Sequence, residues 1–132
     1  MTRTIDTRFF VASFTADTEE MRQRAAQKIR DLERESAILP TIVVHEIYKY
    51  VFEHMGRETA DLRLRLILDS GLSAVNLDIE IAKRSAELRC KYPGLPTSDA
   101  VIAATSILMK SFKVVTDDPH FSAIKEIKLE WF

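Results

Sequence analysis

Acidic side chains stand inside or beside apolar segments of this sequence, where a carboxylate is unusual. They are Asp6 at the end of TRTID, Glu46 within TIVVHEIYKYVF, Asp99 near the start of SDAVIAATSILM, and the pair Asp117-Asp118 after FKVVT. A carboxylate in a buried segment costs free energy unless it is paired or binds a cation. If the fold brings these acids together, they form a metal site.

Electrostatic repulsion defines the kind of ion such a site needs. Two carboxylates about 4 Å apart repel by about 4 kcal/mol at an effective dielectric constant near 20. Three or four of them without a cation would destabilise the fold or raise a pKa sharply. Oxygen ligands favour a hard divalent ion, so we expect Mg²⁺ or Mn²⁺.

Each acid also has an ordinary structural explanation. Asp6 is placed to cap a helical turn, Asp99 to favour the first turn of a helix, and Asp117-Asp118 to form a turn before Pro119. Glu46 would face solvent on the outer side of its helix. None of these explanations requires the acids to share one end of a sheet.

Short apolar runs with strand character alternate with amphipathic helical patterns along the chain. We expect strands over Thr4–Asp6, Ala37–Leu39, Ser73–Leu77, Phe112–Thr116 and Lys128–Trp131. We expect helical segments over Phe9–Phe14, from Thr18 to about Glu35, from Thr41 to about His54, over Glu58–Leu68 and Ile79–Lys91, and from Thr97 or Ser98 to Lys110. Thr18, Thr41, Asp78 and either Thr97 or Ser98 are the predicted helix caps. The pattern predicts one α/β domain over residues 1–132: a three-layer α/β/α fold with a central parallel sheet of about five strands.

Ligands of such sheets bind in the crevice at the carboxyl ends of the strands. Asp6 and Asp117-Asp118 follow predicted strands directly. Asp99 begins a helix after the loop YPGLPTS, and Glu46 lies in the second turn of a helix that follows a strand. All four positions can therefore face one crevice, although only the strand-end acids follow directly from the pattern.

The helical patterns also predict which side chains face the core. The expected rows are Met21, Ala25, Ile29 and Leu32; Val44, Ile47, Tyr48 and Val51; and Ile81, Ala82, Ser85 and Leu88. Cys90, the single cysteine, is expected to be a small core residue.

Composition excludes several classes of protein. The chain has 132 residues with 46% hydrophobic and 30% charged content, which is typical of a globular domain. No apolar run approaches the ~20 residues of a membrane helix, and the start lacks a signal-peptide pattern, so we expect a cytoplasmic protein. A net charge of −1 argues against a sequence-reading DNA binder. The three histidines lack HExxH or HxH spacing, and no phosphate-binding glycine motif is present.

At these same motifs the chain resembles the PIN domain family, in particular the small VapC-like toxins of type II toxin–antitoxin pairs. IDTRFFVASF is similar to the family's strand ending in Asp. TIVVHEIYKYVF resembles its helix with an inward Glu. The most specific stretch is LPTSDAVIAATSILMKSFKVVTDDPHF, with Thr-x-Asp-x-x-Phe at its end. The resemblance covers nearly the whole chain.

The resemblance implies a metal-dependent endoribonuclease that hydrolyses RNA phosphodiester bonds with Mg²⁺ or Mn²⁺. The implied catalytic and metal-binding residues are Asp6, Glu46, Asp99 and Asp118. Asp118 is preferred to Asp117 because it fits the Thr-x-Asp-x-x-Phe spacing from Thr116. The implied supporting residues are Thr7, Thr116 and Asp117, and the candidate phosphate contacts are Arg8 and Lys49. Arg8 replaces a small polar residue of many relatives, and it either contacts phosphate or pairs with an acid.

The resemblance also implies a cognate antitoxin, which would cover the acidic crevice and supply a basic side chain to it. A homodimer is expected as well, because Tyr48, Tyr50, Phe52 and Met55 give one helix more apolar surface than a single core face requires.

Two alternatives belong to other functional classes. A non-catalytic PIN-like module would bind RNA or protein without cleaving it. A receiver-type phosphoacceptor domain would need an acceptor Asp after a middle strand. Asp78 follows the predicted middle strand, but no acidic pair follows the first strand.

Overall fold

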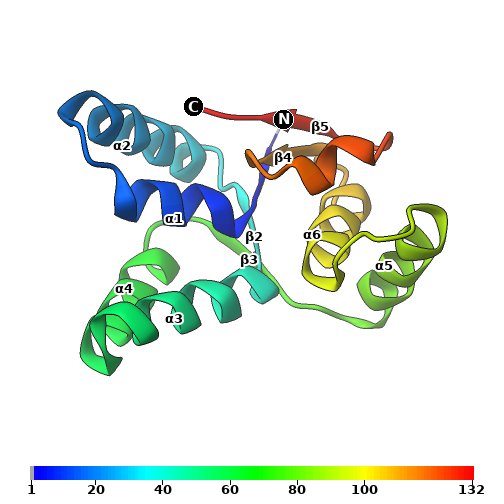
Figure 1. The fold of residues 1–132 in the computed structure, drawn as a ribbon, viewed down its shortest axis with the longest axis horizontal. Coiled ribbons are helices and arrows are strands. Elements are labelled where there is room, and N and C mark those ends of the chain that lie inside the picture. The colour runs from blue at the N-terminus through cyan, green and yellow to red at the C-terminus, as the bar shows by residue number, and fades with distance from the viewer. Residues whose placement is uncertain (1) are drawn as a thin grey trace.

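A five-stranded parallel sheet forms the centre of the computed structural model, which describes residues 2–132 (Figure 1). The strands are β1 (Thr4–Ile5), β2 (Ile38–Pro40), β3 (Ser73–Val75), β4 (Lys113–Val115) and β5 (Lys128–Glu130). Their order is β3-β2-β1-β4-β5, and every neighbouring pair is parallel. The predicted fold class and strand number are therefore confirmed, and β5 is the predicted edge strand.

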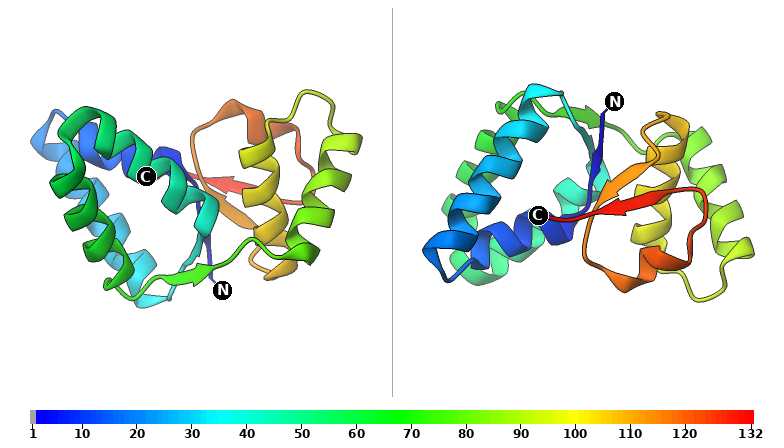
Figure 2. Two further views of the ribbon diagram at one scale, coloured as in Figure 1. Left: turned by 90° about the horizontal axis from the view of Figure 1, so that it is seen from below. Right: turned by 90° about the horizontal axis from the view of Figure 1, so that it is seen from above.

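Helices cover both faces of this sheet. They are α1 (Thr7–Thr15), α2 (Glu19–Arg34), α3 (Thr41–Met55), α4 (Arg57–Leu68), α5 (Ile79–Lys91), α6 (Thr97–Leu108) and the short 3₁₀ helix η1 (Pro119–Ala123). Helices α1 to α4 lie on one side of the sheet and α5 and α6 on the other, as all three views show (Figures 1 and 2). None of the helices in residues 2–132 is long and apolar enough to cross a membrane.

The direction of the strand order reverses beside β1. The chain runs from β1 outward to β2 and β3, then returns across the sheet to β4 and β5. The carboxyl ends of β1 and β4 therefore border the crevice where parallel α/β sheets bind ligands. Because β3 lies at the sheet edge, the prediction that Asp78 follows a middle strand is wrong. Asp78 instead caps α5, accepting a hydrogen bond of 2.8 Å from the Ile81 N–H.

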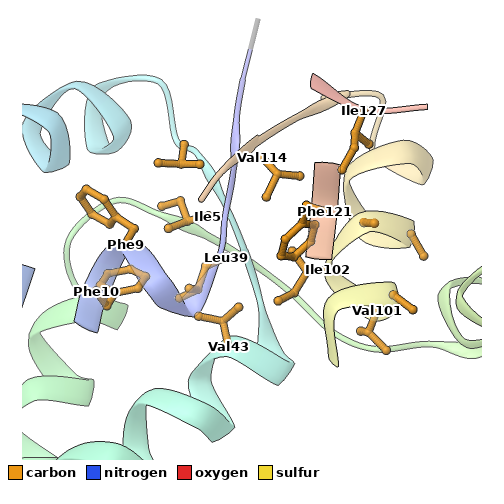
Figure 3. Packing of buried hydrophobic residues seen from close by; sticks show 14 of the residues in the cluster. Ile5, Phe9, Phe10, Leu39, Val43, Val101, Ile102, Val114, Phe121 and Ile127 are labelled. Atoms are coloured by element: carbon orange, nitrogen blue, oxygen red, sulfur yellow. The ribbon is translucent and has the colours of Figure 1, made fainter. Parts of the chain in front are cut away.

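Helix α6 is the most deeply buried element. All residues from 99 to 106 are buried, because α6 contacts three strands and is covered by α5 and η1. Ile102, at the centre of α6, packs in the same cluster as Phe121 of η1 and Val114 of β4 (Figure 3). A helix that is apolar nearly all round is expected in such a position. The start of α6, where Asp99 lies, is consequently fixed by the core.

Two of the predicted helix caps are wrong. Thr41 and Thr97 are the first residues of α3 and α6, whose caps are Pro40 and Pro96, and neither helix start has a side-chain capping bond. A proline in extended conformation stands directly before each helix, so the threonine becomes helical itself. Thr41 Oγ1 instead accepts from the Leu77 N–H at 3.3 Å. The cap at Thr18 is confirmed by a hydrogen bond of 3.1 Å from the Met21 N–H.

One predicted core position of α3 is shifted by a residue. Val43 is fully buried with Ile47 and Val51, whereas Val44 and Tyr48 are only half-buried. The fully buried row has a four-residue spacing, while α4 packs along the neighbouring flank of α3. Helix α3 is therefore covered by both α1 and α4, so its buried side chains do not form the single row that the sequence pattern predicts.

Two expected core residues of α5 are exposed. Ala82 and Cys90 both face solvent, while Ile81, Ser85 and Leu88 are buried. Helix α5 packs mainly against α6, so only a narrow row of its side chains is covered. The expectation that Cys90 belongs to the core is therefore wrong.

The packing of α6 predicts a large difference between two identical substitutions. Ile102 is fully buried, so Ile102→Ala should lower the free energy of unfolding by about 3 kcal/mol. Ile79 is 84% exposed, and Ile79→Ala should change it by less than about 0.5 kcal/mol. Urea unfolding followed by circular dichroism measures both, and equal effects would contradict this packing.

Candidate metal centre

The predicted acids converge at the carboxyl edge of the sheet from four elements. Asp6 directly follows β1, and Asp118 lies three residues beyond the end of β4. Asp99 is in the first turn of α6, and Glu46 is in the second turn of α3. The two strand-end acids thus flank the point where the strand order reverses.

A hydroxyl between the two strand ends orients Asp6 and the segment that carries Asp118. Thr116 Oγ1 donates to Asp6 Oδ2 at 2.6 Å and accepts from the Asp118 N–H at 3.0 Å. Asp6 is only 3% exposed, and its own N–H donates to the Val115 carbonyl at 3.2 Å. Asp6 occupies the cap position of α1, but its carboxylate accepts from the Thr116 hydroxyl and does not close a regular capping bond.

Glu46 is held from the opposite side by Thr7. The Thr7 hydroxyl donates to Glu46 Oε1 at 2.6 Å, which links the start of α1 to α3. Glu46 is half-buried rather than solvent-facing, so the explanation of an outward-facing helix residue does not hold. Its second oxygen has no hydrogen bond from a side chain among residues 2–132.

Asp99 and Asp118 form the tightest group, together with a residue that the sequence patterns did not single out. His120 Nδ1 lies 3.0 Å from Asp118 Oδ1 and 3.4 Å from Asp99 Oδ2. One potential ligand atom from each of the three residues lies within 4.8 Å of the others. The spacing rule for zinc sites missed His120, because these ligands come from two distant segments. Its place two residues after Asp118, in the turn opened by Pro119, was the available signal.

The pKa values show that the four acids form one electrostatic group. Burial, together with the charges of Asp118, Asp6 and Glu46, raises the pKa of Asp99 to about 7, and His120 opposes the rise. Burial also raises the pKa of Asp6 to about 6, with Glu46 contributing, while Thr116 and nearby backbone amides oppose it. Burial and the neighbouring acids thus both disfavour the ionised forms of Asp6 and Asp99.

Asp117 lies outside this group. It forms a two-point ion pair with Arg8, with Nε to Oδ1 at 2.9 Å and Nη2 to Oδ2 at 3.3 Å. Both side chains are substantially exposed. Asp118, by contrast, caps η1 by accepting from the His120 N–H at 2.9 Å and turns toward Asp99. The geometry thus separates the two neighbours, and Arg8 pairs with an acid in this state.

A groove of about 500 Å³ is lined by residues of α1, α3 and the start of α6. Glu46 is the member of the acidic group that lines it, together with Thr7 and with Lys49, which lies one turn further along α3. The ammonium group of Lys49 pairs with Glu53 on the surface of α3. Thr97 and Ser98 at the start of α6 also line the groove, which borders the acidic group at Glu46.

This donor set fits a hard divalent cation. Carboxylate oxygens are the preferred ligands of Mg²⁺ and Mn²⁺, and a cation would offset the burial and the neighbouring charges that raise the pKa values of Asp6 and Asp99. Asp99 and Asp118 offer the closest pair of carboxylates, with Asp6 and Glu46 beside them. Outside these acids, no other group of three or more potential ligands occurs among residues 2–132.

The sequence profile of the PIN domain matches residues 4–127, which include all four acids. The chain belongs to the PIN domain family. Comparison with curated protein sequences finds no significant match.

Solved structures of similar shape include PIN-family members at low sequence identity. VapBC2 of Rickettsia felis, bound to a DNA fragment from its promoter, has a TM-score of 0.81 at 19% identity, covering 100% of this chain and 99% of that chain. VapC20 of Mycobacterium tuberculosis, described as cleaving the sarcin-ricin loop, has a TM-score of 0.75 at 16% identity, covering 94% of this chain and 95% of that chain. FitAcB of Neisseria gonorrhoeae has a TM-score of 0.72 at 20% identity, covering 98% of this chain and 96% of that chain. At these identities the likeness is one of fold.

The raised pKa values predict how stability depends on pH in the metal-free PIN domain. Because Asp6 and Asp99 have folded pKa values of about 6 and about 7, above the ordinary 3.8, the folded state binds more protons than the unfolded state in this range. This stability is present below pH 4 and is lost as pH rises through 6 and 7. We expect a loss of up to about 4 kcal/mol between pH 5 and pH 8.

Chemical denaturation with a chelator present measures this loss. Asp99→Asn should flatten the pH dependence and be more stable than the wild type at pH 8, because it removes one repelling charge. Asp69→Asn, an exposed acid at the end of α4, is the matched control and should follow the wild type. A wild-type curve that rises from pH 5 to pH 8 would contradict the electrostatic grouping.

Proposed function

We propose that this PIN domain is a metal-dependent endoribonuclease that hydrolyses RNA phosphodiester bonds, and that it is the toxin of a toxin–antitoxin pair. The observation that carries the proposal is the convergence of four acids at one edge of a PIN fold with two raised pKa values. Carboxylate oxygens can hold a divalent ion, and such an ion can activate water and stabilise charge in phosphodiester hydrolysis.

In the proposed mechanism Asp6, Asp99 and Asp118 would hold Mg²⁺ or Mn²⁺, with Glu46 beside them. The bound ion would lower the pKa of water and neutralise charge that develops on the scissile phosphate. Thr116 keeps Asp6 oriented through its hydrogen bond of 2.6 Å, so this carboxylate needs no rearrangement. Rigid placement of the acids is the contribution of the fold.

Glu46 is the proposed proton acceptor. Thr7 donates to Oε1 and leaves Oε2 available to take the proton of the attacking water. Glu46 is less buried than Asp6 and Asp99, and it lines the groove in which a substrate would lie. A carboxylate in contact with both the groove and the acidic group suits this role.

Arg8 and Lys49 are the proposed phosphate contacts. Each is engaged with an exposed acid in the free protein, Arg8 with Asp117 and Lys49 with Glu53. Exposed ion pairs contribute only about 0–1 kcal/mol, so an RNA phosphate can displace either acid. Asp117 would then act as a supporting residue that holds Arg8 in place before RNA binds.

The proposed protein partner is a cognate antitoxin. Several solved neighbours are toxin–antitoxin complexes, among them VapBC of Salmonella typhimurium bound to DNA. An antitoxin that covers the acidic crevice and inserts a basic side chain would relieve the same repulsion as the metal ion. It would thereby block both the ion and the substrate.

A homodimer is also proposed, although the structure shifts the surface that supports it. Tyr48 donates to Asp61 of α4 at 2.7 Å, and Arg57 covers the ring of Phe52, so α4 covers part of the apolar face of α3. Met55 and Leu66 remain 49% and 59% exposed. Light scattering should give twice the 15.1 kDa chain mass at micromolar concentration, and a monomer at high micromolar concentration would contradict the proposal.

Substitution of the acids tests the nuclease. Asp6→Asn, Asp99→Asn and Asp118→Asn should each reduce cleavage of single-stranded or looped RNA with Mg²⁺ or Mn²⁺ by at least about 100-fold, because each removes a metal ligand. Cleavage is measured by gel with end-labelled RNA. Equal activity of the wild type and the three variants would refute the mechanism.

Asp117→Asn is the matched control for Asp118→Asn. It alters the neighbouring acid that pairs with Arg8 and should retain cleavage within about 5-fold, since the exposed pair contributes little. Calorimetric titration with Mn²⁺ distinguishes the alternative function: no binding at millimolar Mn²⁺, with no cleavage, would favour a non-catalytic PIN-like module that binds RNA or protein.

A further inference from the structure

His120 joins the acidic group from η1, at a position that the four-acid site does not require. Its Nδ1 is 3.0 Å from Asp118 Oδ1 and 3.4 Å from Asp99 Oδ2. The two other histidines of the chain are elsewhere: His45 and His54 are exposed on α3, and His54 Nδ1 lies 2.8 Å from the Tyr50 carbonyl. Within residues 2–132, His120 is therefore the one imidazole that reaches the acids.

The backbone fixes this position. Asp118 Oδ1 accepts from the His120 N–H at 2.9 Å, so the same carboxylate is bound to the main chain of His120 and faces its ring. Pro119 begins η1 between them, and Phe121 anchors η1 in the core with no exposed surface (Figure 3). The imidazole is 57% exposed, but its attachment point cannot move away from Asp118.

The distances match donors that share one ion. Two neighbouring ligands of an octahedral ion, each about 2.1 Å from it, lie about 3 Å apart. The separations of Nδ1 from the two carboxylates, 3.0 and 3.4 Å, are close to this value. The three ligand atoms also lie together within 4.8 Å, about the separation of opposite ligands or slightly more. Small side-chain adjustments would complete such a site.

We propose that His120 is a nitrogen ligand of the metal centre and makes this centre prefer Mn²⁺ to Mg²⁺. The inference rests on the proposed function, whose ion would be held by Asp99 and Asp118. Mg²⁺ favours oxygen ligands and keeps its waters, whereas imidazole is a ligand of transition-metal ions. Carboxylate ligands alone would discriminate little between Mn²⁺ and Mg²⁺. One imidazole ligand would favour Mn²⁺.

Pulsed electron paramagnetic resonance on the full chain loaded with Mn²⁺ tests the ligation directly. The wild type should show modulation from an imidazole ¹⁴N coupled to Mn²⁺. His120→Asn and His120→Ala should lose it, whereas His54→Asn is the matched control and should retain it. Calorimetry should show that each His120 variant weakens Mn²⁺ binding about 10-fold and Mg²⁺ binding less than about 3-fold, so the preference for Mn²⁺ falls.

The outcomes separate this inference from the nuclease. If Mn²⁺ binds and RNA is cleaved, but no ¹⁴N coupling appears or the His120 variants keep the wild-type preference, His120 is only a surface partner of the acids and the inference is overturned. If the wild type neither binds Mn²⁺ nor cleaves RNA, the proposed function fails together with the inference. Because the ring is exposed, both His120 variants should fold, which circular dichroism checks.

Discussion

Repulsion between carboxylates at the reversal point of the sheet is the constraint on which this molecule depends. Asp6 and Asp99 are 3% and 7% exposed; the charge of Glu46 acts on both, and the charge of Asp118 acts on Asp99. Two carboxylates about 4 Å apart repel by about 4 kcal/mol at an effective dielectric constant of 20. Arg8 is paired with Asp117 instead. Among residues 2–132, His120 alone offers the two closest acids a basic partner.

The fold can hold this charge because β1 is secured at its other end. Arg3, directly before β1, donates to Glu35 after α2 at 2.7 Å and to Glu130 of β5 at 2.5 Å, and Lys28 joins the same Glu130. Thr4 also bonds Ser111 at 2.8 Å in a fully buried contact. The strand has only two residues, so these anchors and the packing of α6 determine where Asp6 emerges. These anchors hold the start of β1, whereas the repelling acids lie where β1 and β4 end.

The sequence predicted the parts of the site that depend on periodicity. A strand that ends in Asp places that Asp at the crevice, and the alternation of strands with helices predicts the parallel sheet. Asp6 and the pair Asp117-Asp118 therefore followed from the pattern, while the preference for Asp118 came from the resemblance to the PIN family. The contribution of His120 could not be predicted, because it depends on how the turn at Pro119 directs a ring toward α6. The same limit explains Val43: a one-residue rotation of α3 is decided by α1 and α4 together, which no single helix encodes. Proline before Thr41 and Thr97 was a readable signal that favoured a direct helix start over a threonine cap.

The acids come from both layers of the molecule, and this gives the centre a role beyond chemistry. Glu46 belongs to α3 on one side of the sheet, Asp99 to α6 on the other, and Asp6 lies between them at the end of β1. An ion held by these residues would link the two helical layers through the sheet. Since such a site exists only in the folded chain, the free energy of ion binding adds to the stability of the fold. The charge arrangement that weakens the metal-free protein therefore makes its folding and its proposed activity depend on the same ion.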